Sequence, residues 1–105
     1  MAVMFVYVTA TDAAEAERIG RAVVTERLAA CANVLAGTRS IYWWEGAVQE
    51  AAEAVLILKT TAERLAALMA RVRELHSYHC PCIEALPVAD GNPDFLAWVE
   101  RETGG

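Results

Sequence analysis

The chain has 105 residues, of which 56% are apolar and 22% charged, and its formal net charge is −5. The length predicts one domain over residues 1–105, and the acidic balance argues against nucleic acid as a partner. No apolar run reaches the roughly 20 residues of a membrane-spanning helix, and residues 1–8 resemble no signal peptide, so we expect no membrane partner and no secretion.

A strand and a helix are predicted first. Val3–Thr9 is continuously apolar, β-branched and aromatic, which is typical of a central strand covered at least partly on both faces. Asp12 is placed to cap a helix, with Glu15 at the capping-box position. Apolar residues at helical spacing extend this helix to about Leu28.

A long hairpin follows, formed by Cys31–Trp44 and Val48–Thr60. Gly37 indicates a bulge in the first strand, and Glu45-Gly46 is a turn signal between the strands. Strands of this length exceed what so small a domain covers by itself.

The second half of the chain predicts a helix, a strand and a short terminal helix. Thr60 and Glu63 have capping-box spacing, and an apolar stripe continues from there to Leu75. Residues 76–80 form a connector before a strand over Cys82–Val88. Asn92 is then placed to cap a last helix.

The resulting order, βαββαβ plus a C-terminal helix, predicts an α+β, ferredoxin-like sandwich with two helices on one face of a four-stranded sheet. The other face needs a cover, so we expect copies of the chain to assemble into a closed ring. Tyr42, Trp43 and Trp44 are the predicted subunit interface, with a ligand-stacking platform as the alternative. Trp43 points away from its two neighbours if the strand is regular.

Four candidate metal ligands are concentrated in seven residues: His76, His79, Cys80 and Cys82. Imidazole and thiolate groups suit copper, zinc and similar ions. Pro81 favours an extended Cys80, which would turn both sulfur atoms to the same side. The alternatives are that the cysteines are small buried apolar residues and that His76 caps the preceding helix.

Catalytic motifs are missing, because the sequence has no phosphate-binding glycine loop, no nucleophile elbow and no zinc-protease helix. We therefore expect a protein that is not an enzyme. Three cysteines without a secretion signal indicate free thiols in a reducing cytoplasm.

Several segments carry a family likeness: residues 26–33, Ser40–Gly46, Lys59-Thr60 and the stretch from Glu74 to Asn92 with its Ala85-Leu86-Pro87-Val88. Together they resemble the CutA family, the divalent-cation-tolerance proteins, over nearly the whole chain. The resemblance implies a ferredoxin-like subunit in a tight homotrimer, with hairpin strands that join across subunits. It also implies a cytoplasmic role in tolerance to divalent metals, copper especially, without a required cofactor. The alternative is a signalling module like the PII proteins, with a small metabolite or a partner protein in clefts between subunits.

The resemblance also bears on the metal ligands. Some family members are credited with copper ligands at a cysteine and at two adjacent histidines, positions that correspond here to Val8, Leu75 and His76. Of that set His76 alone carries over. Two acidic positions of many members hold His79 and Cys82 here, which would make a softer site from nitrogen and sulfur.

Overall fold

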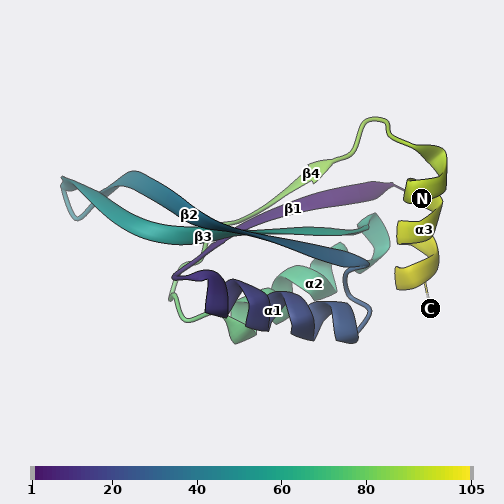
Figure 1. The fold of residues 1–105 in the computed structure, drawn as a ribbon, viewed down its shortest axis with the longest axis horizontal. Coiled ribbons are helices and arrows are strands. Elements are labelled where there is room, and N and C mark those ends of the chain that lie inside the picture. The colour runs from purple at the N-terminus through teal and green to yellow at the C-terminus, as the bar shows by residue number, and fades with distance from the viewer. Residues whose placement is uncertain (1, 105) are drawn as a thin grey trace.

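The computed structural model describes residues 2–104, which form four antiparallel strands and three helices. The elements are β1 (Val3–Ala10), α1 (Ala13–Thr25), β2 (Cys31–Trp44), β3 (Ala47–Thr61), α2 (Ala62–Leu75), β4 (Ile83–Pro87) and α3 (Pro93–Thr103). The strands lie in the order β2-β3-β1-β4, so β1 is central, as its composition predicts (Figure 1). Within residues 2–104, no helix has both the length and the apolar content needed to cross a membrane.

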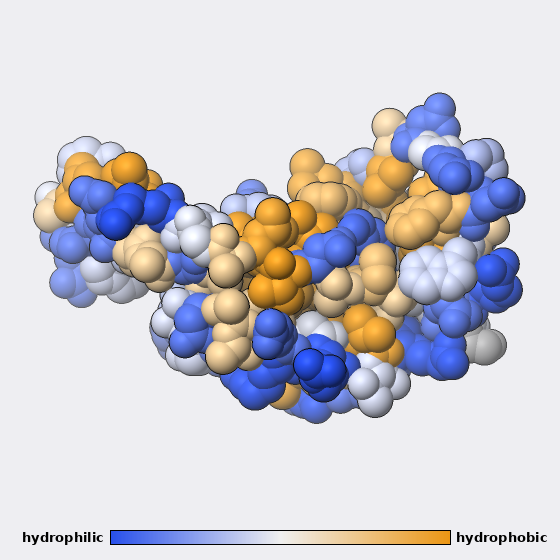
Figure 2. All heavy atoms as spheres, viewed as in Figure 1, coloured by the Kyte–Doolittle hydropathy of each residue, from blue (hydrophilic) through white to orange (hydrophobic). Residues whose placement is uncertain are grey.

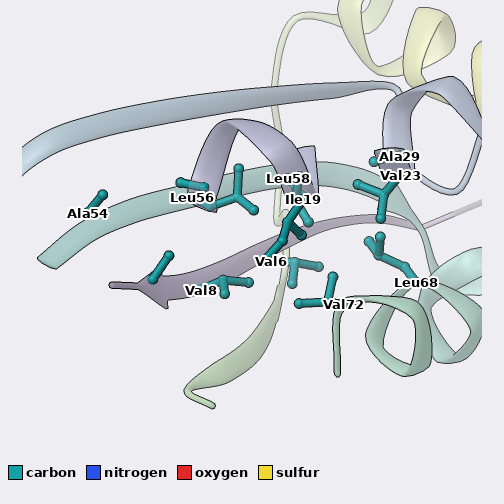
Figure 3. Close-up of a cluster of buried hydrophobic side chains, with 12 residues drawn as sticks. Val6, Val8, Ile19, Val23, Ala29, Ala54, Leu56, Leu58, Leu68 and Val72 are labelled. Atoms are coloured by element: carbon teal, nitrogen blue, oxygen red, sulfur yellow. The ribbon is translucent and has the colours of Figure 1, made fainter. Parts of the chain in front are cut away.

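The core lies between the sheet and the pair α1 and α2, which cover one face (Figures 1 and 3). Alternate residues of the two central strands point to these helices, as Val6 and Leu58 do. Ile19 from α1 and Leu68 from α2 fill the space above them, and all four side chains are fully buried. Burial of each contributes about 1.5–3 kcal/mol to folding.

The opposite face of the sheet is covered at one end. There α3 packs Val99 against Val3 and Ala30, in a second apolar cluster. The hairpin of β2 and β3 extends away from this end and beyond the helices (Figure 1). The molecule is therefore 44 Å long, and its radius of gyration of 14.2 Å exceeds the about 13 Å of a compact domain of this size.

The hairpin contains the predicted bulge and turn. Gly37 has φ of +82°, and the pairing register shifts between Leu35 and Thr38. Glu45 and Gly46 both have positive φ, 49° and 79°, in a two-residue turn whose twist suits antiparallel strands.

The first helix ends earlier than predicted. It stops at Thr25 instead of Leu28, because Arg27 adopts a left-handed φ of 59°. The amides of Leu28 and Ala29 then both donate to the carbonyl of Val23, at 2.9 and 3.2 Å. These bonds satisfy the end of the helix without a glycine, so the stop signal was absent from the sequence.

The predicted cap of the second helix is also wrong. β3 continues through Thr61, which takes the N-cap position of α2 without a side-chain hydrogen bond. The hydroxyl of Thr60 instead donates to the Leu28 carbonyl at 2.7 Å, and so ties β3 to the loop after α1. The other two caps are confirmed: Asp12 accepts from the Glu15 amide, and Asn92 from the Asp94 amide.

Candidate functional site

The predicted last strand is shorter in the structure, since β4 runs from Ile83 to Pro87, and the connector between α2 and β4 therefore comprises residues 76–82. A cavity of about 420 Å³ lies between the hairpin and this connector. Thr38 pairs with Glu53, so Tyr42 and Trp44 further along β2 share the face of Glu53. This is the sheet face opposite α1 and α2. The cavity is lined by Thr9, Tyr42, Trp44, Glu53, Tyr78, His79, Cys80 and Cys82.

The first residue of the connector, His76, is buried and uses both ring nitrogens. Its Nδ1 accepts from the backbone amide of Tyr78 at 3.0 Å. Its Nε2 must then carry the proton, which it donates to the carbonyl of Thr9 at 2.8 Å. The ring also packs against that of Tyr78, with 4.7 Å between centroids. A metal ion would have to displace one of these hydrogen bonds to reach His76.

Glu15 holds the connector from the side of α1. Its carboxylate is 6% exposed and accepts from the amides of Thr11 and Ser77, both at 2.9 Å. Arg18 lies 3.5 Å from the same carboxylate. Burial opposes ionisation of Glu15, but the hydrogen bonds from Ser77 and Thr11 outweigh it and lower the pKa of this carboxyl.

Tyr78 joins the connector to the hairpin. Its hydroxyl donates to Oε2 of Glu53 at 2.7 Å. Burial, together with the neighbouring Glu53 carboxylate, raises the pKa of Tyr78 to about 12. The phenol is therefore a fixed donor at neutral pH, and it holds Glu53 at the wall of the cavity.

The two cysteines of the connector differ in their surroundings. Cys80 is exposed, whereas Cys82 is half-buried with its Sγ 3.6 Å from Oε1 of Glu84. Burial, followed by this hydrogen bond and the charge of Glu84, raises the pKa of the Cys82 thiol. Cys82 is thus held in the thiol form, while metals bind the thiolate.

The structure separates His76 from the other predicted metal ligands. His79, Cys80 and Cys82 line the cavity, but His76 lies outside its lining. Within residues 2–104, no group of three or more His, Cys, Asp or Glu side chains is arranged to hold a metal ion. The donor set therefore does not fit a preformed metal centre within one chain, and metal binding at these residues stays a prediction.

The predicted interface aromatics divide between the two faces of the hairpin. Tyr42 and Trp44 line the cavity, whereas Trp43 points to the other side and is 74% exposed. This is the alternation that strand geometry predicts.

Sequence reasoning missed Glu53, although its place one residue before the buried Ala54 marked it as facing away from the core.

Residues 4–102 match the sequence family described as CutA1 divalent ion tolerance protein. The divalent-cation tolerance protein CutA of Thermus thermophilus is 44% identical over 99 residues, which cover 94% of this chain and 96% of that protein. By contrast, this chain spans only about half the length, 55%, of the CutA 1 protein of rice chloroplasts.

Solved structures agree with this match. The crystal structure of CutA1 from Oryza sativa is 40% identical, with a TM-score of 0.95 over 98% of this chain and 94% of that one. A structure described as the periplasmic divalent cation tolerance protein CutA of Archaeoglobus fulgidus is 39% identical, with a TM-score of 0.92 over 96% and 98%.

Proposed function

The chain belongs to the CutA1 divalent ion tolerance family, and from this premise we propose that it serves tolerance to copper as a cytoplasmic homotrimer of ferredoxin-like subunits. The observation that carries the proposal is the match over residues 4–102, together with relatives about 40% identical over most of their length. The family is named for tolerance to ions and not for a reaction, so we propose no enzymatic activity.

Assembly is supported by apolar side chains on both faces of the hairpin. Ile41, Trp43 and Val48 are exposed on one face, and Tyr42 and Trp44 on the other. Figure 2 shows a few hydrophobic residues among hydrophilic ones at the free end of the projecting arm. A strand pair that is apolar on both faces is typical of a segment enclosed by other copies of the chain.

Metal binding is proposed at the connector, through His79, Cys80 and Cys82. Nitrogen and sulfur donors favour copper over hard ions such as magnesium. Affinity should be weak, because no ligand set is preformed and Cys82 must first lose its proton.

Equilibrium dialysis against copper tests this site. The Cys80→Ser/Cys82→Ser variant should bind less copper per chain than the wild type. Cys31→Ser is the matched control, since Cys31 lies at the start of β2, outside the connector, and should leave the stoichiometry of the connector site intact. Equal copper binding by the double variant and the wild type would exclude the connector as the site.

The cytoplasmic location is supported by the free cysteines Cys31, Cys80 and Cys82, which suit a reducing compartment. The relative from Archaeoglobus fulgidus is described as periplasmic, so the compartment needs its own measurement. Fractionation of the source cells should place the protein with cytoplasmic markers.

A second candidate function is a signalling or binding module like the PII proteins. The cavity of about 420 Å³ favours it, because its volume falls in the range of small-molecule sites. In a thermal-shift screen, a metabolite that raises the melting temperature where copper does not would support this alternative.

A further inference from the structure

The cavity beside the connector has aromatic walls supplied by two segments that are distant in the sequence. Tyr42 and Trp44 come from β2, and Tyr78 comes from the connector that follows α2. In the single chain the rings keep exposed surface, since Tyr42 is 42% and Trp44 59% exposed, and in the proposed assembly the cavity would lie where the hairpin meets other copies. Aromatic rings carry negative charge on their faces, so such a site attracts cations.

A carboxylate completes this arrangement. Glu53 lines the cavity, and within residues 2–104 the one hydrogen bond to its carboxylate comes from the Tyr78 hydroxyl. Among the described residues that line the cavity none is Lys or Arg, and within residues 2–104 no ion pair includes Glu53. The carboxylate thus has no cationic partner among residues 2–104.

We propose that this cavity binds an organic ammonium ion, with Glu53 as the counter-charge and Tyr42, Trp44 and Tyr78 as the walls. An alkylated ammonium group is weakly hydrated and can exchange its water for aromatic surface at low cost. A small inorganic cation holds its water firmly and needs several oxygen, nitrogen or sulfur ligands. Beside the rings Glu53 alone supplies such a ligand, so an inorganic ion would bind at His79, Cys80 and Cys82 on the other part of the cavity lining. The part of the cavity formed by the rings and Glu53 therefore favours the organic ion.

This site is separate in chemistry from the proposed copper site. The copper proposal depends on the sulfur atoms of Cys80 and Cys82, whereas the ammonium proposal depends on Glu53 and the rings. Serine at both cysteine positions should abolish the first and leave the second. Each proposal can therefore fail without the other.

The probe is the tetramethylammonium ion, titrated into the ¹⁵N-labelled assembled protein and followed by two-dimensional NMR. tert-Butanol is the neutral comparison of similar size, and potassium chloride controls for ionic strength. We expect the wild type to bind tetramethylammonium at least about tenfold more tightly than tert-butanol. Potassium should not compete beyond the general effect of salt.

The matched variants are Glu53→Gln and Glu50→Gln. Glutamine at 53 still accepts the Tyr78 hydrogen bond but removes the charge, so tetramethylammonium affinity should fall about tenfold or more. Glu50 pairs with Ile41, on the other face of the hairpin, so its neutralisation should leave the affinity unchanged.

Three outcomes would overturn the proposal, and none of them depends on a variant that fails to fold. They are absence of tetramethylammonium binding by the wild type, equal affinity for tert-butanol, and unchanged affinity in Glu53→Gln. Retained tetramethylammonium binding in Cys80→Ser/Cys82→Ser, with copper binding lost, would show two separate sites.

Discussion

At the scale of single residues, Glu15 stabilises the segment that forms the cavity. Its carboxylate accepts amide hydrogen bonds from Thr11, beside the start of α1, and from Ser77, in the connector. A buried carboxylate that accepts two amides orders both chain segments at once. The connector is positioned by this contact and by the bonds of His76 and Tyr78 to the sheet and hairpin.

Glu15→Gln should lower the free energy of unfolding at pH 7 by about 1–3 kcal/mol, measured by urea denaturation. The amide side chain offers one acceptor oxygen in place of two, so either the Thr11 or the Ser77 N–H loses its partner. Glu17→Gln is the control on the same helix, because Glu17 is exposed and should change stability by less than about 0.5 kcal/mol. Equal effects of the two substitutions would contradict the role of Glu15.

The difference in stability between the wild type and Glu15→Gln should depend on pH. Folding lowers the pKa of Glu15, so its contribution is complete above the unfolded-state pKa of about 4.3 and disappears as the pH falls through the lower folded value. The stability difference between wild type and Glu15→Gln should therefore be constant near neutrality and shrink below roughly pH 4. A difference that does not change over this acidic range would show that ionisation of Glu15 plays no part.

Residue roles were predictable where the partner lies nearby in the sequence. The Asp12 cap follows from local spacing, whereas the hydrogen bond that Glu15 accepts from the Ser77 amide joins residues 62 positions apart. His76 shows the same limit. Its residue type suggested a metal ligand, but its buried place beside Thr9 gives both ring nitrogens backbone partners, which no local pattern could reveal.

At the scale of elements, β3 and the loop after α1 are joined by Thr60. This side chain is fully buried, and its hydroxyl donates to the carbonyl of Leu28. Residues 26–30 lack regular structure of their own, so the bond fixes the entry of the chain into β2. The neighbouring Thr61 is also buried but makes no capping bond to α2.

Thr60→Val should lower the free energy of unfolding by about 1–3 kcal/mol, because it leaves the Leu28 carbonyl without its donor in a partly buried position. Thr61→Val, the matched control, removes no cap bond and should cost less. Both values come from chemical denaturation of the purified variants. A larger loss of stability in Thr61→Val than in Thr60→Val would instead indicate that Thr61 caps α2.

The elements themselves were largely predictable, because local residue chemistry determines most of them. Glu45-Gly46 and Gly37 supplied the backbone freedom that the turn and the bulge require, and both features are confirmed. The end of α1 was not predictable, because Arg27 adopts a left-handed conformation that is ordinarily found at a glycine. Local hydrogen bonds from the amides of Leu28 and Ala29 to the carbonyl of Val23 close the helix there without a glycine.

At the scale of the whole molecule, the dominant feature is a hairpin that its own chain does not cover. Trp43 and Ile41 are 74% and 66% exposed near its free end. Exposed large apolar groups on a projecting arm favour association with further copies. In a closed ring every subunit would bury its arm in the same way. The proposed assembly would therefore depend on the hairpin more than on the packed body.

Trp43→Asp should convert the proposed homotrimer into smaller species. Sedimentation equilibrium of the wild type at micromolar concentration should give three times the chain mass of 11.4 kDa, and the variant a mass nearer to one chain. At the proposed interface the substitution would bury a carboxylate without a partner. The free energy that this costs exceeds the binding free energy that most single interface contacts contribute. Ala67→Asp is the control, since it adds the same charge at an exposed position of α2 and should keep the wild-type mass. A trimer retained by Trp43→Asp would remove Trp43 from the interface, and a wild-type mass of one chain would refute the assembly itself.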